Sequence, residues 1–271
     1  MTALVTRDDL SARSALSKST LAEYDLCQTK AWHALYHRLP AVPNERMTFG
    51  SAVDAAIETA VKFLRSEQSI EYERCMAAAH EVIARDEVAV DSAEVERALD
   101  TWLVTVAPRY DFRYARTQHR ISGTLPDLGD VDGHPDVWLA DGRIFDVKTS
   151  SRAKPEEMTT ELAFYALIAQ EVEGIRVPAV GYWTWVRIGK PYWQTLEFTV
   201  TDEWLQWAVE TAAAYVRAAR VDRMHNERTE HPNNWAFGGG PSFPSLCSDC
   251  QYATRCPRVR PSAKGEGDDA A

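Results

Sequence analysis

The stretch GHPDVWLADGRIFDVKTS, residues 133–150, contains two short apolar runs on either side of an Asp-Gly pair. Asp136 lies in the first run and Asp146 in the second, which ends Asp-Val-Lys at Lys148. Short apolar runs separated by Asp-Gly predict a β-hairpin. Because side chains alternate along a strand, Asp146 and Lys148 point to the same face. We therefore expect a charged site on an otherwise apolar hairpin.

The length of the hairpin loop decides whether Asp136 shares that face. A two-residue turn at 141–142 would place Asp136 opposite Val147, on the wrong face. A three-residue loop at 140–142, with its glycine in the left-handed conformation, places Asp136 opposite Asp146. We predict the three-residue loop, or a bulge with the same effect.

Two facing aspartates are suitable ligands for a hard divalent cation such as Mg²⁺ or Mn²⁺. A lysine beside them would polarise an attacking water or stabilise the charge of a reacting phosphate. This pattern favours metal-dependent cutting of nucleic acid. The alternative is a surface hairpin with an Asp–Lys pair on its solvated face, and the hairpin alone leaves both interpretations open.

Composition limits the class of protein. The chain has 271 residues, of which 45% are hydrophobic, enough for one large domain or for a domain with an appendage. Its net charge of -10 opposes binding to phosphates unless basic residues cluster on one face. No apolar run is long enough for a membrane span, and the first residues lack the apolar core of a signal peptide. We therefore expect a cytoplasmic protein that does not bind membranes, whose cysteines bind metal instead of forming disulfides.

Hydrophobic periodicity predicts an α/β fold. Helices are expected from about residue 17, from Gly50 and twice over 70–107, followed by strands from about Arg116. An amphipathic helix ends at Gly174, and a hairpin and a long helix follow it. We predict one domain over 17–257, with a helical insertion at about 52–112, a core at about 113–200, a C-terminal helix and cysteine segment at about 201–257, and flexible ends at 1–16 and 258–271.

Two tryptophans on the last predicted hairpin, Trp183 and Trp185, share one face of their strand. If exposed, they would stack unpaired bases. If buried, they are part of the core, which is the more common case for such residues.

Three cysteines near the end of the chain form the pattern C-x₂-C-x₅-C at Cys247, Cys250 and Cys256. A four-thiolate site lacks one ligand, which Cys27 supplies only if the two ends of the chain meet. Such a site suits an iron–sulfur cluster or Zn²⁺, and unrelated buried thiols are a third possibility. We interpret it as a structural clasp, because it would close a loop of about 220 residues. Cys75 is predicted to be a buried free thiol on a helix.

The PD…DVK pattern resembles the PD-(D/E)xK nuclease superfamily. The closer resemblance is to its RecB-like branch with an iron–sulfur cluster, which includes Cas4 and Cas4-like phage exonucleases. SKSTLAEYDLC at 17–27 is similar to the opening motif of this branch, and CSDCQYATRCP at 247–257 to its last. GSAVD carries Asp54 where histidine is usual, and ELAFYALIA carries Glu161 in place of glutamine but retains Tyr165.

The resemblance implies a restriction-endonuclease-like core, with a mixed central sheet flanked by helices. It implies a [4Fe–4S] cluster on Cys27 and the three C-terminal cysteines, with Zn²⁺ as the alternative there. The implied ligands of Mg²⁺ or Mn²⁺ are Asp54, Asp136, Asp146 and the Val147 carbonyl. The implied catalytic residues are Asp136, Asp146, Lys148, Glu161 and Tyr165.

The implied activity is that of a metal-dependent DNA exonuclease, acting on single strands or DNA ends in recombination, repair or replication. A phage-encoded enzyme would act in the host cytoplasm, with a single-strand annealing protein as its partner. A Cas4 role beside CRISPR adaptation proteins is an alternative. Another is a DNA-binding or structural iron–sulfur protein without catalysis, which Asp54 and Glu161 favour because both depart from the family pattern.

Overall fold

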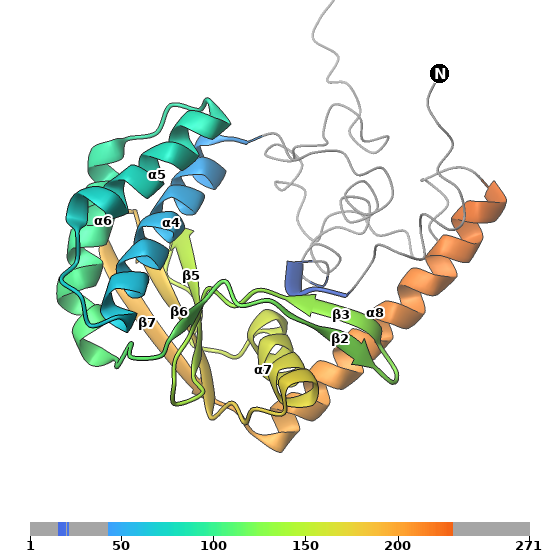
Figure 1. The fold of residues 1–271 in the computed structure, drawn as a ribbon. Coiled ribbons are helices and arrows are strands. Elements are labelled where there is room, and N and C mark those ends of the chain that lie inside the picture. Colours follow the sequence, from blue (N-terminus) through green and yellow to red (C-terminus); the bar gives the residue numbers. More distant parts are fainter. Residues whose placement is uncertain (1–15, 20, 22–42, 230–271) are drawn as a thin grey trace, which may run out of the picture. The chain divides into compact units, whose positions relative to one another are not determined.

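The computed structural model describes residues 16–19, 21 and 43–229, with side chains as far as residue 216 (Figure 1). The chain divides into two compact units. One comprises residues 15–18 and 43–213 and contains all the elements discussed below up to the first turns of α8. The other comprises 1–14, 19–42 and 214–271, of which Ser19, Leu21 and the later turns of α8 are described. The single domain predicted over 17–257 stays a prediction.

Between residues 43 and 115, four helical segments precede the sheet: α4 (Glu45–Arg65), α5 (Tyr72–Asp86), α6 (Ser92–Thr105) and the 3-10 turn η1 (Ala107–Arg109). The two helices predicted over 70–107 are confirmed. The predicted start of α4 at Gly50 is wrong, because Asn44 caps the helix by accepting a hydrogen bond of 3.0 Å from Met47 N. Gly50 lies inside α4, where a Cβ atom would approach Thr149 Oγ1 to 3.0 Å.

The central sheet has five strands in the order β1-β4-β5-β6-β7. Its strands are β1 (Arg116–Thr117), β4 (Val137–Trp138), β5 (Ile144–Ser150), β6 (Ala179–Val186) and β7 (Tyr192–Thr199). β5 and β6 are parallel, and the other neighbours are antiparallel. Helix α7 (Thr160–Glu173) makes the crossover that a parallel pair requires. The predicted α/β fold with a mixed sheet and flanking helices is confirmed.

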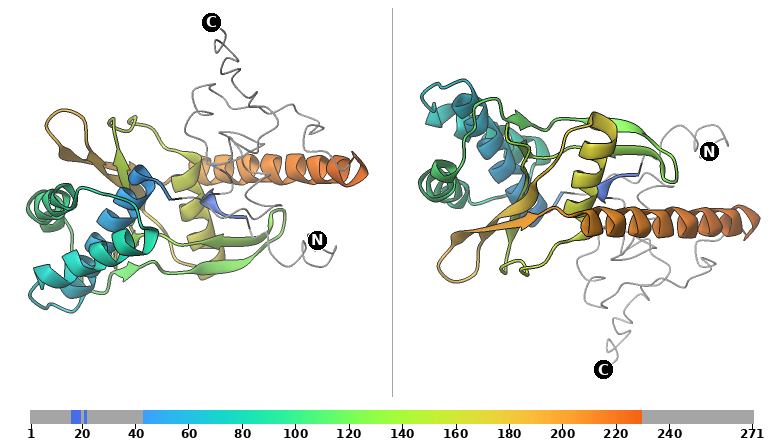
Figure 2. Two further views of the ribbon diagram at one scale, coloured as in Figure 1. Left: turned by 90° about the horizontal axis from the view of Figure 1, so that it is seen from above. Right: turned by 90° about the horizontal axis from the view of Figure 1, so that it is seen from below.

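Helices α4, α5 and α6 gather into one layer, and α7 lies apart from them (Figures 1 and 2). The α4–α6 layer shares a core with one face of the sheet, where Phe145 stacks on Trp183 with ring centroids 4.6 Å apart. Trp183 and Trp185 are fully buried, so they are core residues and not a surface for bases. The prediction that α7 is amphipathic is wrong, because residues 162–169 are all buried.

A second, two-stranded sheet was not expected from the sequence. It consists of β2 (Ile121–Leu125) and β3 (Gly129–Gly133), and both strands contact α7. Leu16, at the boundary of the predicted flexible end, is buried and pairs with β3. Its N–H donates to Asp130 O at 2.7 Å, and its carbonyl accepts from Asp132 N at 2.9 Å. Leu16 is therefore tied to this small sheet by two backbone hydrogen bonds.

The remaining findings concern the last described helix, the cysteine of α5 and the search for membrane-spanning helices. Helix α8 (Asp202–Thr229) follows β7, as predicted. Cys75 is a buried free thiol on α5, also as predicted, and burial raises its pKa. Among the described helices, none is both long and apolar enough to cross a membrane.

Candidate active site

The β4–β5 hairpin has the register that places the two aspartates opposite each other. Val137 pairs with Phe145 and Trp138 with Ile144, so the next pair in the ladder is Asp136 and Asp146. Residues 140–142 form the three-residue loop, closed by a hydrogen bond of 2.8 Å from Leu139 N to Arg143 O. Gly142 adopts φ +92°, in the left-handed region. The predicted loop is confirmed.

The carboxylate of Asp136 is fixed by two donors from different elements. Its Oδ2 accepts a hydrogen bond of 2.7 Å from Val147 N, the backbone of the facing strand. Its Oδ1 accepts one of 3.1 Å from the side chain of Gln118. Asp136 is thus held in position by the hairpin itself and by the residue that follows β1.

Asp146 is 1% exposed and lies between two lysines. Lys148, two residues further on the same strand, places its ammonium 2.5 Å from Asp146 Oδ2. Lys18, from the N-terminal segment, pairs with Oδ1. Each oxygen of Asp146 therefore faces a positive charge.

Charge and burial set the protonation of this cluster. Burial opposes ionisation of Asp146, but Lys148 and Lys18 lower its pKa to about 2. Burial and the neighbouring charges of Asp146 and Asp54 instead raise the pKa of Asp136. The pKa of Lys148 is raised by Asp146 in spite of burial. The lysines therefore favour the charged form of Asp146, whereas Asp136 beside it holds its proton more tightly.

Asp54, on α4, joins the cluster through Gln118. The amide of Gln118 donates to Asp54 Oδ2 at 3.4 Å as well as to Asp136, and so bridges the two acids. Gln118 adopts φ 48°, an uncommon conformation for a residue other than glycine. Burial, followed by the charges of Glu58 and Asp146, raises the pKa of Asp54 to about 6.

Glu161 lies in the first turn of α7, within reach of the same charges. Its Oε2 accepts a hydrogen bond of 3.3 Å from the hydroxyl of Tyr182, on β6. That hydroxyl also lies 2.6 Å from Oγ1 of Thr159, which caps α7. The helix cap and the strand thereby orient Glu161 together.

Tyr165, one turn after Glu161, is 1% exposed. Its hydroxyl donates a hydrogen bond of 2.8 Å to the carbonyl of His134, two residues before Asp136. The Lys18 ammonium lies 4.8 Å from the centre of its ring. The hydroxyl of Tyr165 is thus engaged with the backbone that leads into the hairpin.

The structure brings together all the predicted site residues of the metal core: Asp54, Asp136, Asp146, Val147, Lys148, Glu161 and Tyr165. The four predicted cluster ligands, Cys27, Cys247, Cys250 and Cys256, lie outside the described residues. Sequence reasoning missed Lys18 and Gln118. Lys18 lies within the stretch SKSTLAEYDLC, which resembles a family motif, but Lys18 was assigned no role from the sequence. Nothing in the sequence around Gln118 indicates that it belongs to the site.

The donor set suits a hard divalent cation, because Asp54, Asp136 and Asp146 supply carboxylate oxygens in one cluster. Within the described part of the chain, no three acidic, histidine or cysteine side chains already surround one point as metal ligands. Lys18 and Lys148 contact the two oxygens of Asp146 that a cation would need. Asp54, Asp136 and Asp146 would hold the metal, with exchange of some of these contacts.

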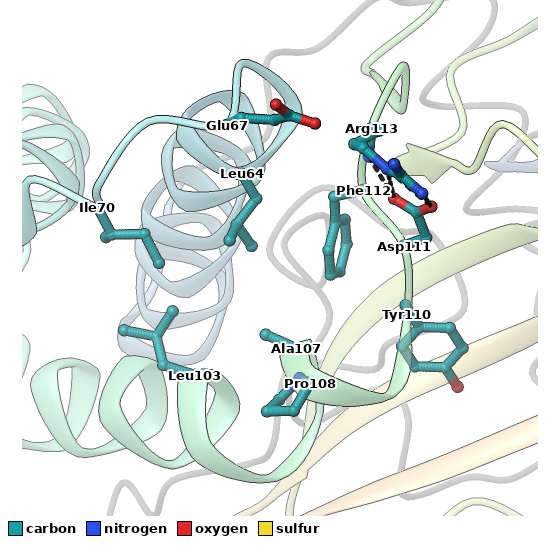
Figure 3. A pocket seen from close by; sticks show the side chains of 10 residues that line it. All are labelled: Leu64, Glu67, Ile70, Leu103, Ala107, Pro108, Tyr110, Asp111, Phe112 and Arg113. Atoms are coloured by element: carbon teal, nitrogen blue, oxygen red, sulfur yellow. Dashed lines mark hydrogen bonds and ion pairs between the residues drawn. The ribbon is translucent and has the colours of Figure 1, made fainter.

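An apolar cavity of about 350 Å³ lies elsewhere, between α4, α6 and the segment after η1 (Figure 3). Leu64, Leu103 and Phe112 line it, and the ion pair of Asp111 with Arg113 lies at its edge. None of the acids of the β4–β5 hairpin lines this cavity. The charged cluster, and not this cavity, is therefore the candidate active site.

A family model described as the PD-(D/E)XK nuclease superfamily matches residues 15–257. The chain belongs to this superfamily. The name of the superfamily describes the cluster: Pro135 and Asp136, followed by Asp146, Val147 and Lys148. Membership supports a nuclease, and the RecB-like iron–sulfur branch within the PD-(D/E)XK superfamily stays a prediction.

One solved structure resembles this chain in its fold. The crystal structure of "Putative exonuclease" from Eubacterium rectale has a TM-score of 0.51 and 14% identity, over 93% of this chain and 94% of that one. At this identity the likeness concerns the fold alone. The crystal structure of SSO0001 covers 92% of this chain and 98% of its own, at 12% identity, but its TM-score of 0.32 carries no argument. No curated protein matches the chain.

Proposed function

We propose that this PD-(D/E)XK nuclease is a metal-dependent DNA exonuclease that hydrolyses phosphodiester bonds in single strands or at DNA ends. The observation that carries the proposal is the hairpin register, which places Asp136 opposite Asp146 and bonds its carboxylate to Val147 N, with Lys148 paired to Asp146. Two acids can hold a divalent cation, and a lysine beside them can stabilise the charge that develops on a phosphate during hydrolysis.

A divalent cation held by the acids would lower the pKa of an attacking water and neutralise charge on the phosphate. Lys148 keeps a positive charge beside this position, because Asp146 raises its pKa. Asp136 is held in place by Val147 N, so it needs little reorganisation. Tyr165 supports the turn before Asp136 through His134 O, and Glu161 adds a further negative charge.

The test is cleavage of end-labelled DNA, single-stranded and double-stranded, with Mg²⁺, with Mn²⁺ and with a chelator. Wild type is expected to shorten linear DNA from an end only when metal is present. Closed circular single-stranded DNA, which has no ends, should remain intact. Cleavage of the circle at the same rate as linear DNA would show that the protein is an endonuclease and not an exonuclease.

Matched variants separate catalysis from contamination and from misfolding. Lys148→Ala and Asp146→Asn are expected to reduce the rate at least about 100-fold. Lys190→Ala, which removes an exposed lysine on the β6–β7 turn, should retain full activity. Wild type that binds DNA but cuts none of the substrates would favour the binding or structural role.

We also propose that Cys27, Cys247, Cys250 and Cys256 hold a [4Fe–4S] cluster, which the order of the cysteines supports and for which Zn²⁺ is the alternative. Elemental analysis of anoxically purified protein should find about four iron atoms per chain. Cys247→Ser should lose that iron, whereas Cys75→Ser should retain it because Cys75 is a buried free thiol on α5. About one zinc and no iron per chain would support the alternative.

A further inference from the structure

A short loop joins the two elements that carry residues of the candidate active site. It spans residues 151–159, between β5, which carries Asp146, and α7, which carries Glu161. The loop contains two basic residues, Arg152 and Lys154. Because the elements at both ends of the loop contribute to the candidate active site, the loop lies beside that site.

Lys154 is fixed in this loop through its backbone. Its N–H donates a hydrogen bond of 2.7 Å to the side-chain oxygen of Gln194, on β7. Its carbonyl accepts a hydrogen bond of 3.0 Å from the side-chain nitrogen of the same glutamine. Pro155 follows, and a proline favours an extended backbone at the residue before it. The position of Lys154 is therefore set by the fold, unlike that of a lysine on a free turn.

The register of the sheet relates this position to the catalytic strand. Lys148 on β5 pairs with Thr184 on β6, which pairs with Gln194 on β7. Residues paired in this way point to the same face of a sheet, and neighbouring strands are about 4.8 Å apart. Gln194 therefore stands in one row with Lys148, with about 10 Å between their backbones. It holds Lys154 at the face of the sheet that carries the candidate active site.

The ammonium of Lys154 lies over an aromatic ring beside the acids. It is 5.3 Å from the centre of the Tyr182 ring. Tyr182 pairs with Asp146 in the register of β5 and β6, and its hydroxyl donates a hydrogen bond to Glu161. The ammonium is thus placed over a residue that is one strand away from Asp146.

The two cations of the loop are not neutralised by acids. Within the part of the chain that the structure describes, neither the Lys154 ammonium nor the Arg152 guanidinium has an acidic partner. Glu156 and Glu157 lie on the same loop and are exposed, but they pair with neither cation. In a chain with a net charge of -10, such unpaired cations beside the acids are what a phosphate backbone needs for binding.

We propose that the β5–α7 loop forms a phosphate-binding subsite, in which Lys154, assisted by Arg152, holds a backbone phosphate of the DNA strand next to the phosphate that is cut. This inference rests on the proposed function and extends it to the contact that positions the strand. Successive phosphates of one strand are about 3.4 Å apart along a duplex axis, so a cation one or two strands from Asp146 is in range of a neighbouring phosphate. Phosphate contacts position a nucleic acid without reading its sequence, so Lys154 should act on all sequences alike.

The salt dependence of DNA binding tests the charge of Lys154. The probe is a fluorescently labelled oligothymidylate, with Ca²⁺ in place of Mg²⁺. Lys154→Met should weaken binding at least about 5-fold and should reduce the slope of log affinity against log salt by about 0.7. Lys154→Arg should retain both values. Arg97→Met, which removes a positive charge from α6 on the other face of the sheet, should change neither. Wild-type affinity and slope in Lys154→Met would overturn the proposal.

A second variant tests the positioning of the loop by β7. Gln194→Leu keeps both cations but removes the two hydrogen bonds to the backbone of Lys154. It should weaken binding of the oligothymidylate while the slope stays that of wild type, because no charge is lost. Wild-type affinity in Gln194→Leu would show that this glutamine does not position the subsite.

Cleavage kinetics separate binding from chemistry. Lys154→Met should raise KM at least about 5-fold and leave kcat nearly unchanged at saturating DNA. A fall in kcat with an unchanged KM would overturn the subsite and assign Lys154 to the orientation of Glu161 through Tyr182. Circular dichroism and thermal unfolding establish that the variants fold, and Lys154→Gln serves if the methionine variant does not.

The two measurements also distinguish failure of the subsite from failure of the proposed function. Wild type that binds DNA but cuts none would refute the proposed function, and the binding series would still decide the subsite. Wild type that cuts DNA, with unaltered binding in Lys154→Met, would overturn the subsite alone. Wild type that binds no DNA would overturn both.

Discussion

Asp136 accepts a hydrogen bond of 2.7 Å from the amide of Val147, the residue that follows Asp146 on the facing strand. This bond ties the first acid to the strand that carries the second acid and Lys148. The geometry of the site therefore depends on the register of one short hairpin. A shift by one residue would turn Asp136 away from Asp146, because alternate residues point to opposite faces.

The loop glycine should be essential to that register. At Gly142, φ is +92° and a Cβ atom would lie 2.7 Å from the carbonyl of Arg176. Gly142→Ala should lower the free energy of unfolding by about 1–3 kcal/mol, through backbone strain and this clash. The matched control is Gly129→Ala, where φ is +80° but the added atom meets nothing within 4 Å. If denaturant unfolding gives the same loss of unfolding free energy for both variants, backbone strain alone, without the clash, explains the effect at Gly142.

Gln118 should position two metal ligands at once. Its amide bridges Asp54 and Asp136, so Gln118→Leu frees both carboxylates to move. We expect Mn²⁺ affinity to fall at least about 10-fold, as for other residues that orient metal ligands. Gln206→Leu is the control, since Gln206 also donates to a carboxylate, that of Glu210, but on α8. Titration calorimetry on both variants decides, and an unchanged affinity for Gln118→Leu would remove its positioning role.

The metal-free protein should lose stability as the pH rises through about 6. The pKa of Asp54 is about 6 in the folded protein and 3.8 as its ordinary value. The folded state thus binds the proton of Asp54 more tightly than the unfolded state does. The stability that this proton contributes is fully present below about pH 4 and is lost above about pH 6. At pH 7 this shift of the Asp54 pKa lowers the free energy of unfolding of the metal-free protein by on the order of 3 kcal/mol. The raised pKa of Asp136 acts in the same direction.

Asp54→Asn checks that prediction. In a chelator, this variant should be more stable than wild type at pH 7 and should show a flatter dependence of unfolding free energy on pH between 4 and 7. The same change should weaken Mn²⁺ binding, because a carboxylate ligand is lost. A variant with the same pH dependence as wild type would mean that Asp54 ionises normally in the folded protein.

Tyr165→Phe should test support of the hairpin by α7. The variant loses the hydrogen bond to His134 O but keeps the buried ring, so the free energy of unfolding should fall by about 1 kcal/mol. The rate of cleavage should fall as well, because the backbone before Asp136 loses its support. Tyr192→Phe, at an exposed tyrosine of β7, should change neither quantity. A loss of rate with no loss of stability would assign the hydroxyl to the substrate instead.

Much of the site could be predicted because the information is local. The hairpin loop follows from its Asp-Gly pair and from the need to place two acids on one face. Gly174 ends α7 in the left-handed conformation, φ +66°, as its place after the helical pattern predicts. Asn44, in contrast, caps α4 before the predicted start, because Gly50 resembles a boundary although it lies within a helix against Thr149.

By itself the sequence determined the PD…DVK hairpin and the mixture of helices and strands, because these depend on alternation, turn residues and helical periodicity within a few positions. The register of the hairpin followed only from the added requirement that both acids share one face. Only the tertiary structure decided that Lys18 faces Asp146 and that Gln118 bridges Asp54 to Asp136. Lys18 and Asp146 are 128 residues apart, and no local pattern carries such a contact. It arises because Leu16 pairs with β3 and α7 packs against the same small sheet, which brings distant charges into one buried cluster.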